Sequence, residues 1–316
     1  MTEFSRRLAV ATIAALTISL AIWAAGAGAV QAQPALAEFE VQKAIEYATH
    51  DGVKLEGDLY VPKAAGKYPV MITVHGGGWQ VGNRTNYQFW GNWLAARGIA
   101  VFSITYRLSK PGQKTYPQAV NDLRAAVQFV KGHAAALKLD PERVGLIGDS
   151  AGGHLVALVA LAGDDPAFAG AYPQDPFAAT GTKVKAVVGA YGVYDMTQQF
   201  NHDLLTRPQD SIVQKFLGSP PWDNRKMYFE SSPMSWVTSD KKATSFLLTY
   251  GTEDDIVDRQ QSDALLLALK QAGFYARSVV HQGIGHFWMT ADPVDDPRGA
   301  AAHLAPRLLR FLAERL

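Results

Sequence analysis

Residues 143–161 read RVGLIGDSAGGHLVALVAL: a short apolar run, a serine among glycines, and a second apolar run. The first run is typical of a buried strand and the second of a helix, so the chain must turn sharply at Ser150. Gly148 and Gly152 complete a G-x-S-x-G pattern, in which glycine avoids a clash with the neighbouring backbone. Such a turn raises the serine hydroxyl at the carboxyl edge of a sheet, near the positive end of a helix. The stretch therefore predicts a nucleophile rather than an ordinary turn serine.

Strands and helices alternate on both sides of this stretch. Short apolar runs predict strands buried on both faces at residues 68–77, 99–108, 184–195, 244–255 and 275–286. Apolar residues at helical spacing predict helices at residues 86–97, 116–138, 259–273 and 301–316. In residues 41–63, apolar and polar residues alternate on both sides of Asp51-Gly52, which predicts an edge hairpin. The pattern predicts an α/β fold: a mainly parallel sheet with helices on both faces, occupying residues 39–316.

One segment, at about residues 198–240, interrupts this alternation. It is rich in aromatic residues, contains several prolines and has no sustained hydrophobic period. The segment follows the end of a predicted strand, where α/β sheets bind ligands. We therefore expect a small cap over the site, with a long surface insertion as the alternative.

A second motif, HGGGW, occupies His75–Trp79 directly after a predicted strand. Three glycines leave backbone N–H groups free to point at an incoming oxygen, as an oxyanion hole requires. Together with the serine turn downstream, the motif predicts the amides of Gly77, Gly78 and Ala151 as the donors. A flexible glycine turn is the alternative. His75 itself leads into the loop and is expected to be structural.

The general base is expected in a loop after the last strand, in the chain order Ser, Asp, His. His286 lies in such a loop, between glycine and aromatic residues. His154 falls in the helix after Ser150, and His281 falls within a strand. The remaining histidines are in polar or helical settings typical of a surface: His50, His133, His202 and His303.

The acid that orients the base is expected after the preceding strand. Asp254 and Asp255 both follow that strand, so the residues alone leave both open. Asp258 and Asp195 are expected to be loop residues or helix caps.

The motifs HGGGW, SITYRLS, YPQAVNDLRAAVQFV, LDPERVGLIGDSAGGHLVAL, SSPMSWV, YGTEDDIV and GIGHFW follow one another along the chain. In this order the chain, from about Val41 to its C-terminus, resembles esterases and lipases of the α/β-hydrolase superfamily. The resemblance is to the hormone-sensitive-lipase-like and bacterial feruloyl-esterase-like groups. It implies the α/β-hydrolase fold and, through the G-T-x-D pattern, Asp254 as the acid. It also implies structural roles for Tyr106, Arg107 and Asp122.

The sequence departs from the family pattern at two places. Lys110-Pro111-Gly112 stands where an acidic residue or proline is usual after YRLS, and Asp258 stands where proline is common after DDIV. Neither position belongs to the predicted triad, so the departures concern the shape of the pocket.

These features predict a serine carboxylesterase that acts on small-molecule esters through an acyl-enzyme on Ser150, with His286 as base and Asp254 as acid. The same residues can hydrolyse amides, so an amide hydrolase or peptidase is one alternative. A non-catalytic binding protein on the same fold is another, but it would be expected to have lost a member of the triad.

Composition excludes several other classes. The chain has 316 residues, 48% of them hydrophobic and 19% charged, as in soluble globular proteins. A net charge of +1, without basic clusters beside aromatics, gives no reason to expect nucleic acid. There is no cysteine, no H-E-x-x-H and no G-x-G-x-x-G, so we expect no disulfide, metal or nucleotide cofactor. The oligomeric state is left open.

The N-terminus predicts export. Arg6 and Arg7 precede a long apolar run that ends in small residues, with Val30-Gln31-Ala32 as a cleavage site. We expect residues 1–32 to be a cleaved signal; an uncleaved membrane anchor and a twin-arginine signal are the alternatives. In each case the body of the chain is expected outside the cytoplasm, periplasmic or secreted.

Overall fold

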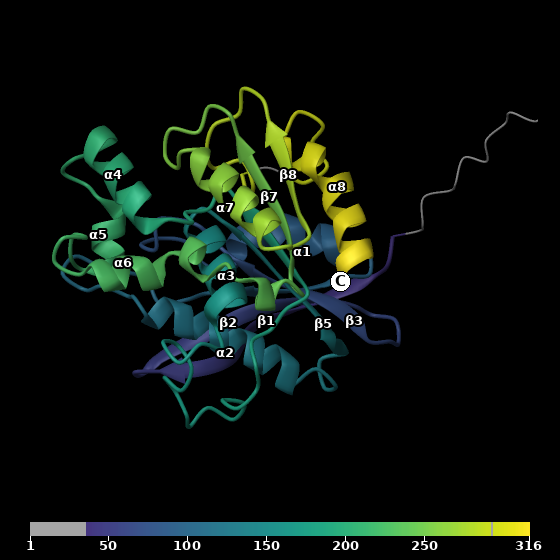
Figure 1. Ribbon diagram of the computed structural model, residues 1–316. Coiled ribbons are helices and arrows are strands. Elements are labelled where there is room, and N and C mark those ends of the chain that lie inside the picture. The colour runs from purple at the N-terminus through teal and green to yellow at the C-terminus, as the bar shows by residue number, and fades with distance from the viewer. Residues whose placement is uncertain (1–35, 292) are drawn as a thin grey trace, which may run out of the picture. The chain divides into compact units, whose positions relative to one another are not determined.

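An eight-stranded sheet, in the order β1-β2-β4-β3-β5-β6-β7-β8, lies at the centre of the computed structural model (Figure 1). The structure describes residues 36–291 and 293–316, so the predicted signal at residues 1–32 lies outside the described residues. β1 pairs with β2, and β2 with β4, in antiparallel fashion, and the other neighbours pair in parallel. The strands are β1 (Phe39–His50), β2 (Val53–Pro62), β3 (Tyr68–Val74), β4 (Ala100–Ile104), β5 (Leu139–Asp149), β6 (Ala186–Ala190), β7 (Ser245–Gly251) and β8 (Ala276–His281).

Helices cover both faces of the sheet (Figure 1). Successive strand residues point to opposite faces, so Met71 of β3 belongs to a hydrophobic cluster with residues of α1 and α8, whereas Ile72 belongs to a cluster with residues of α2, α3 and α7. The predicted mainly parallel α/β fold is confirmed. The helices are α1 (Gln88–Ala95), α2 (Gln118–Gly132), α3 (Ala151–Ala162), α4 (Met196–Thr206), α5 (Ile212–Leu217), α6 (Arg225–Ser231), α7 (Gln260–Gln271) and α8 (Ala300–Arg315).

Element boundaries differ from the predicted ones in several places. The edge hairpin turns at Asp51-Gly52 as expected, and both residues have positive φ, which suits an Asp-Gly turn. The helix predicted to reach residue 138 ends at Gly132, and β5 begins at Leu139, before the predicted strand. β6, β7 and β8 are shorter than predicted, and the last residues of each predicted strand lie in the loop that follows it.

The segment at about residues 198–240 folds into short helices, beginning with α4 at Met196. α4 contacts the loop after β7, where Gln199 Nε2 and Arg207 Nη2 donate to the Ile256 carbonyl oxygen at 2.9 and 3.0 Å. α5 lies against the HGGGW motif, where Phe216 stacks on Trp79 with ring centroids 4.5 Å apart. The segment is therefore packed against two loops at the carboxyl edge of the sheet, and its role as a cap stays a prediction.

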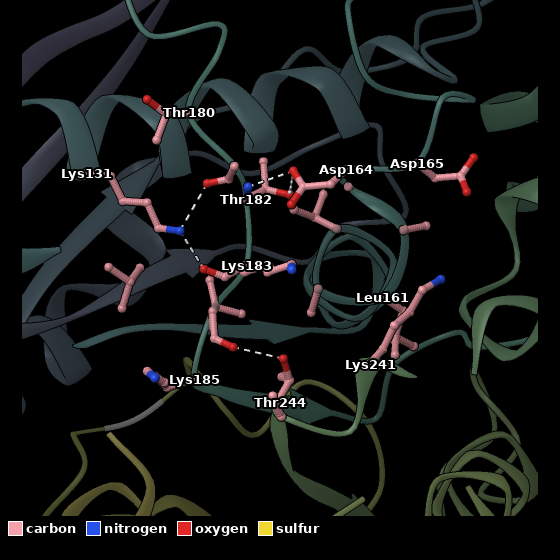
Figure 2. A pocket seen from close by; sticks show the side chains of 18 of the residues that line it. Lys131, Leu161, Asp164, Asp165, Thr180, Thr182, Lys183, Lys185, Lys241 and Thr244 are labelled. Carbon is pink, nitrogen blue, oxygen red and sulfur yellow. Dashed lines mark hydrogen bonds between the residues drawn. The ribbon is translucent and has the colours of Figure 1, made fainter. Parts of the chain in front are cut away.

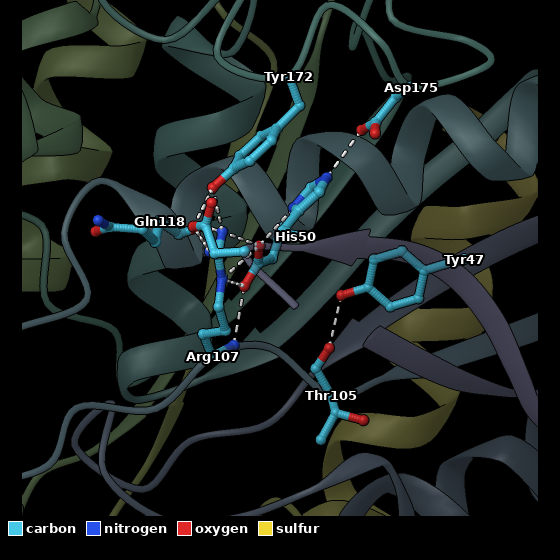
Figure 3. A network of polar contacts seen from close by, with 9 residues as sticks. Tyr47, His50, Thr105, Arg107, Gln118, Tyr172 and Asp175 are labelled. Atoms are coloured by element: carbon cyan, nitrogen blue, oxygen red, sulfur yellow. Dashed lines mark hydrogen bonds and ion pairs between the residues drawn. The ribbon is translucent and has the colours of Figure 1, made fainter. Parts of the chain in front are cut away.

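A polar network ties the edge hairpin to α2 (Figure 3). His50 places Nδ1 3.0 Å from Asp122 Oδ1 and Nε2 2.8 Å from Asp175 Oδ2, while Arg107 donates to Asp122 and to the Tyr172 hydroxyl. Burial alone would lower the pKa of His50, but its hydrogen bonds to the two carboxylates raise that pKa above 6.5. The predicted surface-like setting of His50 is wrong, because this histidine is only 1% exposed.

Among the described residues, no helix combines the length and apolar character needed to cross a bilayer.

Candidate active site

Ser150 occupies the sharp turn between β5 and α3. Its backbone has φ 51° and ψ −118°, a combination that is unfavourable for a residue with a β-carbon. The turn is held by a hydrogen bond from the Ser150 N–H to the Ala190 carbonyl oxygen (2.8 Å). As the N-cap of α3, the serine stands at the positive end of a 12-residue helix.

The flanking glycines are required by close backbone approach. A β-carbon on Gly148 would lie 2.4 Å from the Gly152 carbonyl oxygen, and one on Gly152 would lie 2.0 Å from the Val74 oxygen and 2.7 Å from that of His75. The expected reason for glycine at both positions is confirmed. The same contacts place the start of the HGGGW loop directly against the serine turn.

Three side chains form a hydrogen-bonded chain across this edge of the sheet. His286 Nε2 lies 2.9 Å from Ser150 Oγ, and His286 Nδ1 lies 2.7 Å from Asp254 Oδ2. The side chains of His286 and Asp254 are 1% and 0% exposed. Each residue sits just beyond a strand, after β5, β7 and β8 respectively for serine, acid and histidine. We call these three residues the triad; their catalytic roles stay predictions.

Asp254, and not Asp255, is the carboxylate that meets the histidine. Asp254 Oδ1 accepts hydrogen bonds from the N–H groups of Ile256 (3.0 Å) and Val257 (2.9 Å), which turn Oδ2 toward His286. The side chain of Asp255 has no part in this arrangement, although its carbonyl oxygen lies 3.0 Å from His202 Nε2. The other two acids are caps or loop residues as expected: Asp195 caps α4, and Asp258 accepts from the Gln260 N–H.

The HGGGW loop presents free amides beside the serine. Gly77 and Gly78 have φ of 104° and 59°, values that glycine adopts without strain. Within residues 36–291 and 293–316, no protein group accepts from the backbone N–H groups of Gly77, Gly78 or Ala151. An oxyanion hole requires unpaired amides, so the assignment of these three donors stays a prediction.

The surroundings of His75 are those of a buried structural residue. Its ring is 1% exposed, stacks on Tyr106 at 4.4 Å, and places Nδ1 2.7 Å from the Gly76 carbonyl oxygen. Burial lowers the pKa of His75 to about 4, so the ring is neutral near pH 7. Tyr106 also donates from its hydroxyl to the His75 carbonyl oxygen (3.0 Å), which fits the structural role implied for this tyrosine.

Asp149 is a residue of the site that sequence reasoning missed. Its carboxylate, buried beside Ser150, accepts the Gly76 N–H at 3.0 Å and so anchors the HGGGW loop. Burial raises its pKa to about 6. Sequence offers no signal for this contact, because the two partners are 73 residues apart.

Asp149→Asn is expected to stabilise the fold at alkaline pH relative to the native chain. A folded-state pKa near 6, above the ordinary 3.8, means that Asp149 costs stability as pH rises from about 4 through 6. The asparagine variant should gain about 3 kcal/mol on the native chain by pH 8 and almost nothing at pH 4. Urea unfolding at both pH values measures this; an equal gain at both would contradict it. Asparagine keeps an oxygen that can accept the Gly76 N–H, whereas alanine does not. Asp149→Ala should therefore lose more activity than Asp149→Asn.

A second buried contact links the HGGGW loop to the segment after β6. Trp79 Nε1 donates to His154 Nδ1 at 3.3 Å, and His154 Nε2 donates to the Ser231 carbonyl oxygen at 2.7 Å. Burial lowers the pKa of His154 to about 4, so it serves as a neutral link. The sequence places His154 on the correct helix but cannot show either partner.

A cavity of about 950 Å³ lies away from the triad, near the amino ends of β6 and β7 (Figure 2). Part of its polar lining is paired within the protein. Lys131 Nζ donates to the carbonyl oxygens of Gly181 and Lys183, and Thr182 donates to Asp164. The triad follows the carboxyl ends of the strands, so this cavity does not belong to the candidate active site. Among the described residues, no group of three potential metal ligands is found.

The eight-stranded, mainly parallel sheet with helices on both faces is the fold of the α/β-hydrolases. The BD-FAE family model matches residues 57–269, and the chain belongs to that family. Among its curated relatives in Mycobacterium tuberculosis are "Probable carboxylic ester hydrolase LipM", 32% identical over 79% of this chain and 55% of the relative, and "Esterase LipQ", 34% identical over 65% and 46%. The chain thus spans about half the length of these relatives.

Solved structures share the same fold. A bifunctional GH43-CE protein of Bacteroides eggerthii has a TM-score of 0.70 and 26% identity, over 87% of this chain and 38% of that one. A thermophilic esterase of Thermogutta terrifontis, Est2, has a TM-score of 0.69 and 23% identity, over 89% and 92%.

Proposed function

We propose that this chain is a serine carboxylesterase that hydrolyses small carboxylic esters through an acyl-enzyme on Ser150. The observation that carries the proposal is the continuous hydrogen-bonded chain Ser150–His286–Asp254 on a strained strand-to-helix turn. Membership in the BD-FAE family and relatives named as esterases support the same reaction class.

The geometry suits acyl transfer in two steps. His286 Nε2 takes the proton of the Ser150 hydroxyl as the oxygen attacks the ester carbonyl, while Asp254 holds the proton on Nδ1. The negative oxygen that forms is stabilised by the amides of Gly77, Gly78 and Ala151. The imidazolium then protonates the departing alkoxide, which leaves as the alcohol and gives the acyl-serine. Water, deprotonated by His286, attacks the acyl carbon, releases the carboxylic acid and restores the serine.

An ester and amide comparison tests the proposed reaction. Purified protein is expected to hydrolyse p-nitrophenyl esters from acetate to octanoate with saturable kinetics, and to turn over the matching p-nitroanilides far more slowly. Faster anilide hydrolysis would assign an amidase. Hydrolysis of neither class by folded protein would favour the non-catalytic alternative.

We also propose that the enzyme acts outside the cytoplasm. The support is the sequence of residues 1–32, with its paired arginines, apolar run and small-residue cleavage site. N-terminal sequencing of protein recovered from expressing bacteria is expected to begin after Ala32. Protein that starts at Met1 and stays in the cytoplasmic fraction would contradict export.

A further inference from the structure

Phe287, the residue after the base, combines strain with exposure. Its φ is 65°, a left-handed conformation that is unfavourable for a bulky side chain. Its ring is 63% exposed, so core packing cannot be the reason for an aromatic residue here. Strain held at an exposed position next to a catalytic base is a recurring mark of function.

The ring of Phe287 lies against the base itself. Its centroid is 4.5 Å from that of the His286 imidazole, with the rings nearly perpendicular at 89°. Another ring, that of Tyr191, also contacts His286 at 4.4 Å, but Tyr191 is 1% exposed and accepts the Met289 N–H from within the protein. Tyr191 therefore supports the base from the interior, and Phe287 meets it from the solvent-exposed side.

Other exposed apolar side chains belong to the segments around the triad. Val81, 64% exposed, donates its N–H to the Gly77 carbonyl oxygen at 3.1 Å, so it is bonded to the HGGGW loop. Leu205, 86% exposed, lies on α4, which is bonded to the acid loop. Phe287 differs from both because it contacts a member of the triad.

The position of the base tells which part of an ester this ring would meet. His286 Nε2 must come within hydrogen-bond distance of the departing alkoxide oxygen in order to protonate it. A group packed against that imidazole and open to solvent thus faces the alcohol part of the ester. The acyl oxygen is held on the other side of the reacting carbon, by the amides of the HGGGW loop.

We propose that Phe287 contacts the alcohol moiety of the substrate and confers a preference for alcohols that carry an apolar or ring-shaped group. This inference rests on the proposed esterase function and names a specificity-determining residue for it. An aromatic face offers an apolar contact to larger alkyl groups and a stacking surface to rings, whereas the single carbon of a methyl ester gains little from either.

The test varies the alcohol while the acyl group stays fixed. Methyl, cyclohexyl and benzyl butyrate are hydrolysed by the native chain and by Phe287→Ala. The ratio of kcat/KM for benzyl to methyl butyrate is expected to fall about tenfold in the variant, with cyclohexyl butyrate behaving like benzyl. The kcat/KM of methyl butyrate should change less than twofold. A series of methyl esters from acetate to hexanoate should keep its relative rates.

Two further variants separate specificity from folding. Phe287→Gly removes the ring and the left-handed strain together, so it should lose the same alcohol preference while its Tm rises by about 2 °C. Leu267→Ala is the matched control, because Leu267 is likewise an exposed apolar residue (58%) but lies on α7, outside the segment expected to form a cap. It should leave every ratio unchanged.

An unchanged benzyl-to-methyl ratio in Phe287→Ala would overturn the inference. The same holds if that ratio is unchanged because all esters lose activity equally, which would mean that the ring only shields the His286–Asp254 pair. In both cases the native chain still hydrolyses esters, and the proposed function stands. A native chain that hydrolyses none of the esters would overturn the function and this inference together.

Discussion

Replacing Ser150 by alanine is expected to lower kcat for ester hydrolysis by roughly 10⁴- to 10⁶-fold, because it removes the hydroxyl that lies within hydrogen-bond distance of His286 Nε2. Alanine has a β-carbon, as serine does, so the backbone strain at φ 51° is unchanged. The bond that holds the turn runs from the backbone N–H to Ala190 and survives the substitution. The variant should therefore unfold at nearly the native Tm, and the loss should lie in kcat.

Ser245→Ala is the control for this prediction. Ser245 is another buried serine, 8% exposed, but it begins β7 at the opposite end of the strand from the triad. It should keep kcat within about twofold. A Ser150→Ala protein that retains more than a tenth of native turnover would show that the nucleophile has been misassigned.

Replacing Asp254 by asparagine is expected to lower kcat by up to about 10⁴-fold while leaving the fold intact. The single oxygen of asparagine can still accept the N–H groups of Ile256 and Val257, which Oδ1 accepts in the native chain. Its NH₂ group then faces His286 Nδ1 and, as a donor, favours the tautomer with the proton on Nε2. A protonated Nε2 cannot take the proton of Ser150.

Asp255→Asn is the matched substitution one residue further along. Within the part of the chain that the structure describes, Asp255 contacts a side chain, that of His202, through its backbone oxygen alone, so this variant should keep native turnover. Steady-state kinetics on both variants decide between the two carboxylates. Loss of activity in Asp255→Asn, with native activity in Asp254→Asn, would reverse the assignment.

The parts of the fold that sequence predicted well are those decided by local pattern. Residues 143–161 carry a strand, a glycine-flanked turn and a helix in consecutive positions, and all three form. The Asp51-Gly52 turn is likewise decided by two residues. The short helices α5 and α6 were not predicted, because their six and seven residues are too few to establish a hydrophobic period.

The choice between Asp254 and Asp255 could not be made from the local sequence pattern alone. Asp254 and Asp255 both follow β7, and only the backbone N–H groups of residues 256 and 257 turn one carboxylate toward the histidine. Contacts of Asp149, His50 and His154 could not be predicted either, because each joins segments 72 to 77 residues apart. Such pairs are decided by how the whole chain packs, and a single sequence carries no direct record of them.

Labelling with a fluorophosphonate, followed by mass spectrometry of the digested protein, tests the assignment of Ser150 as the nucleophile. A single adduct on Ser150 is expected, formed at a rate that falls sharply in Asp254→Asn and is lost in Ser150→Ala. An adduct on a different residue, or no adduct on folded protein, would contradict the triad assignment.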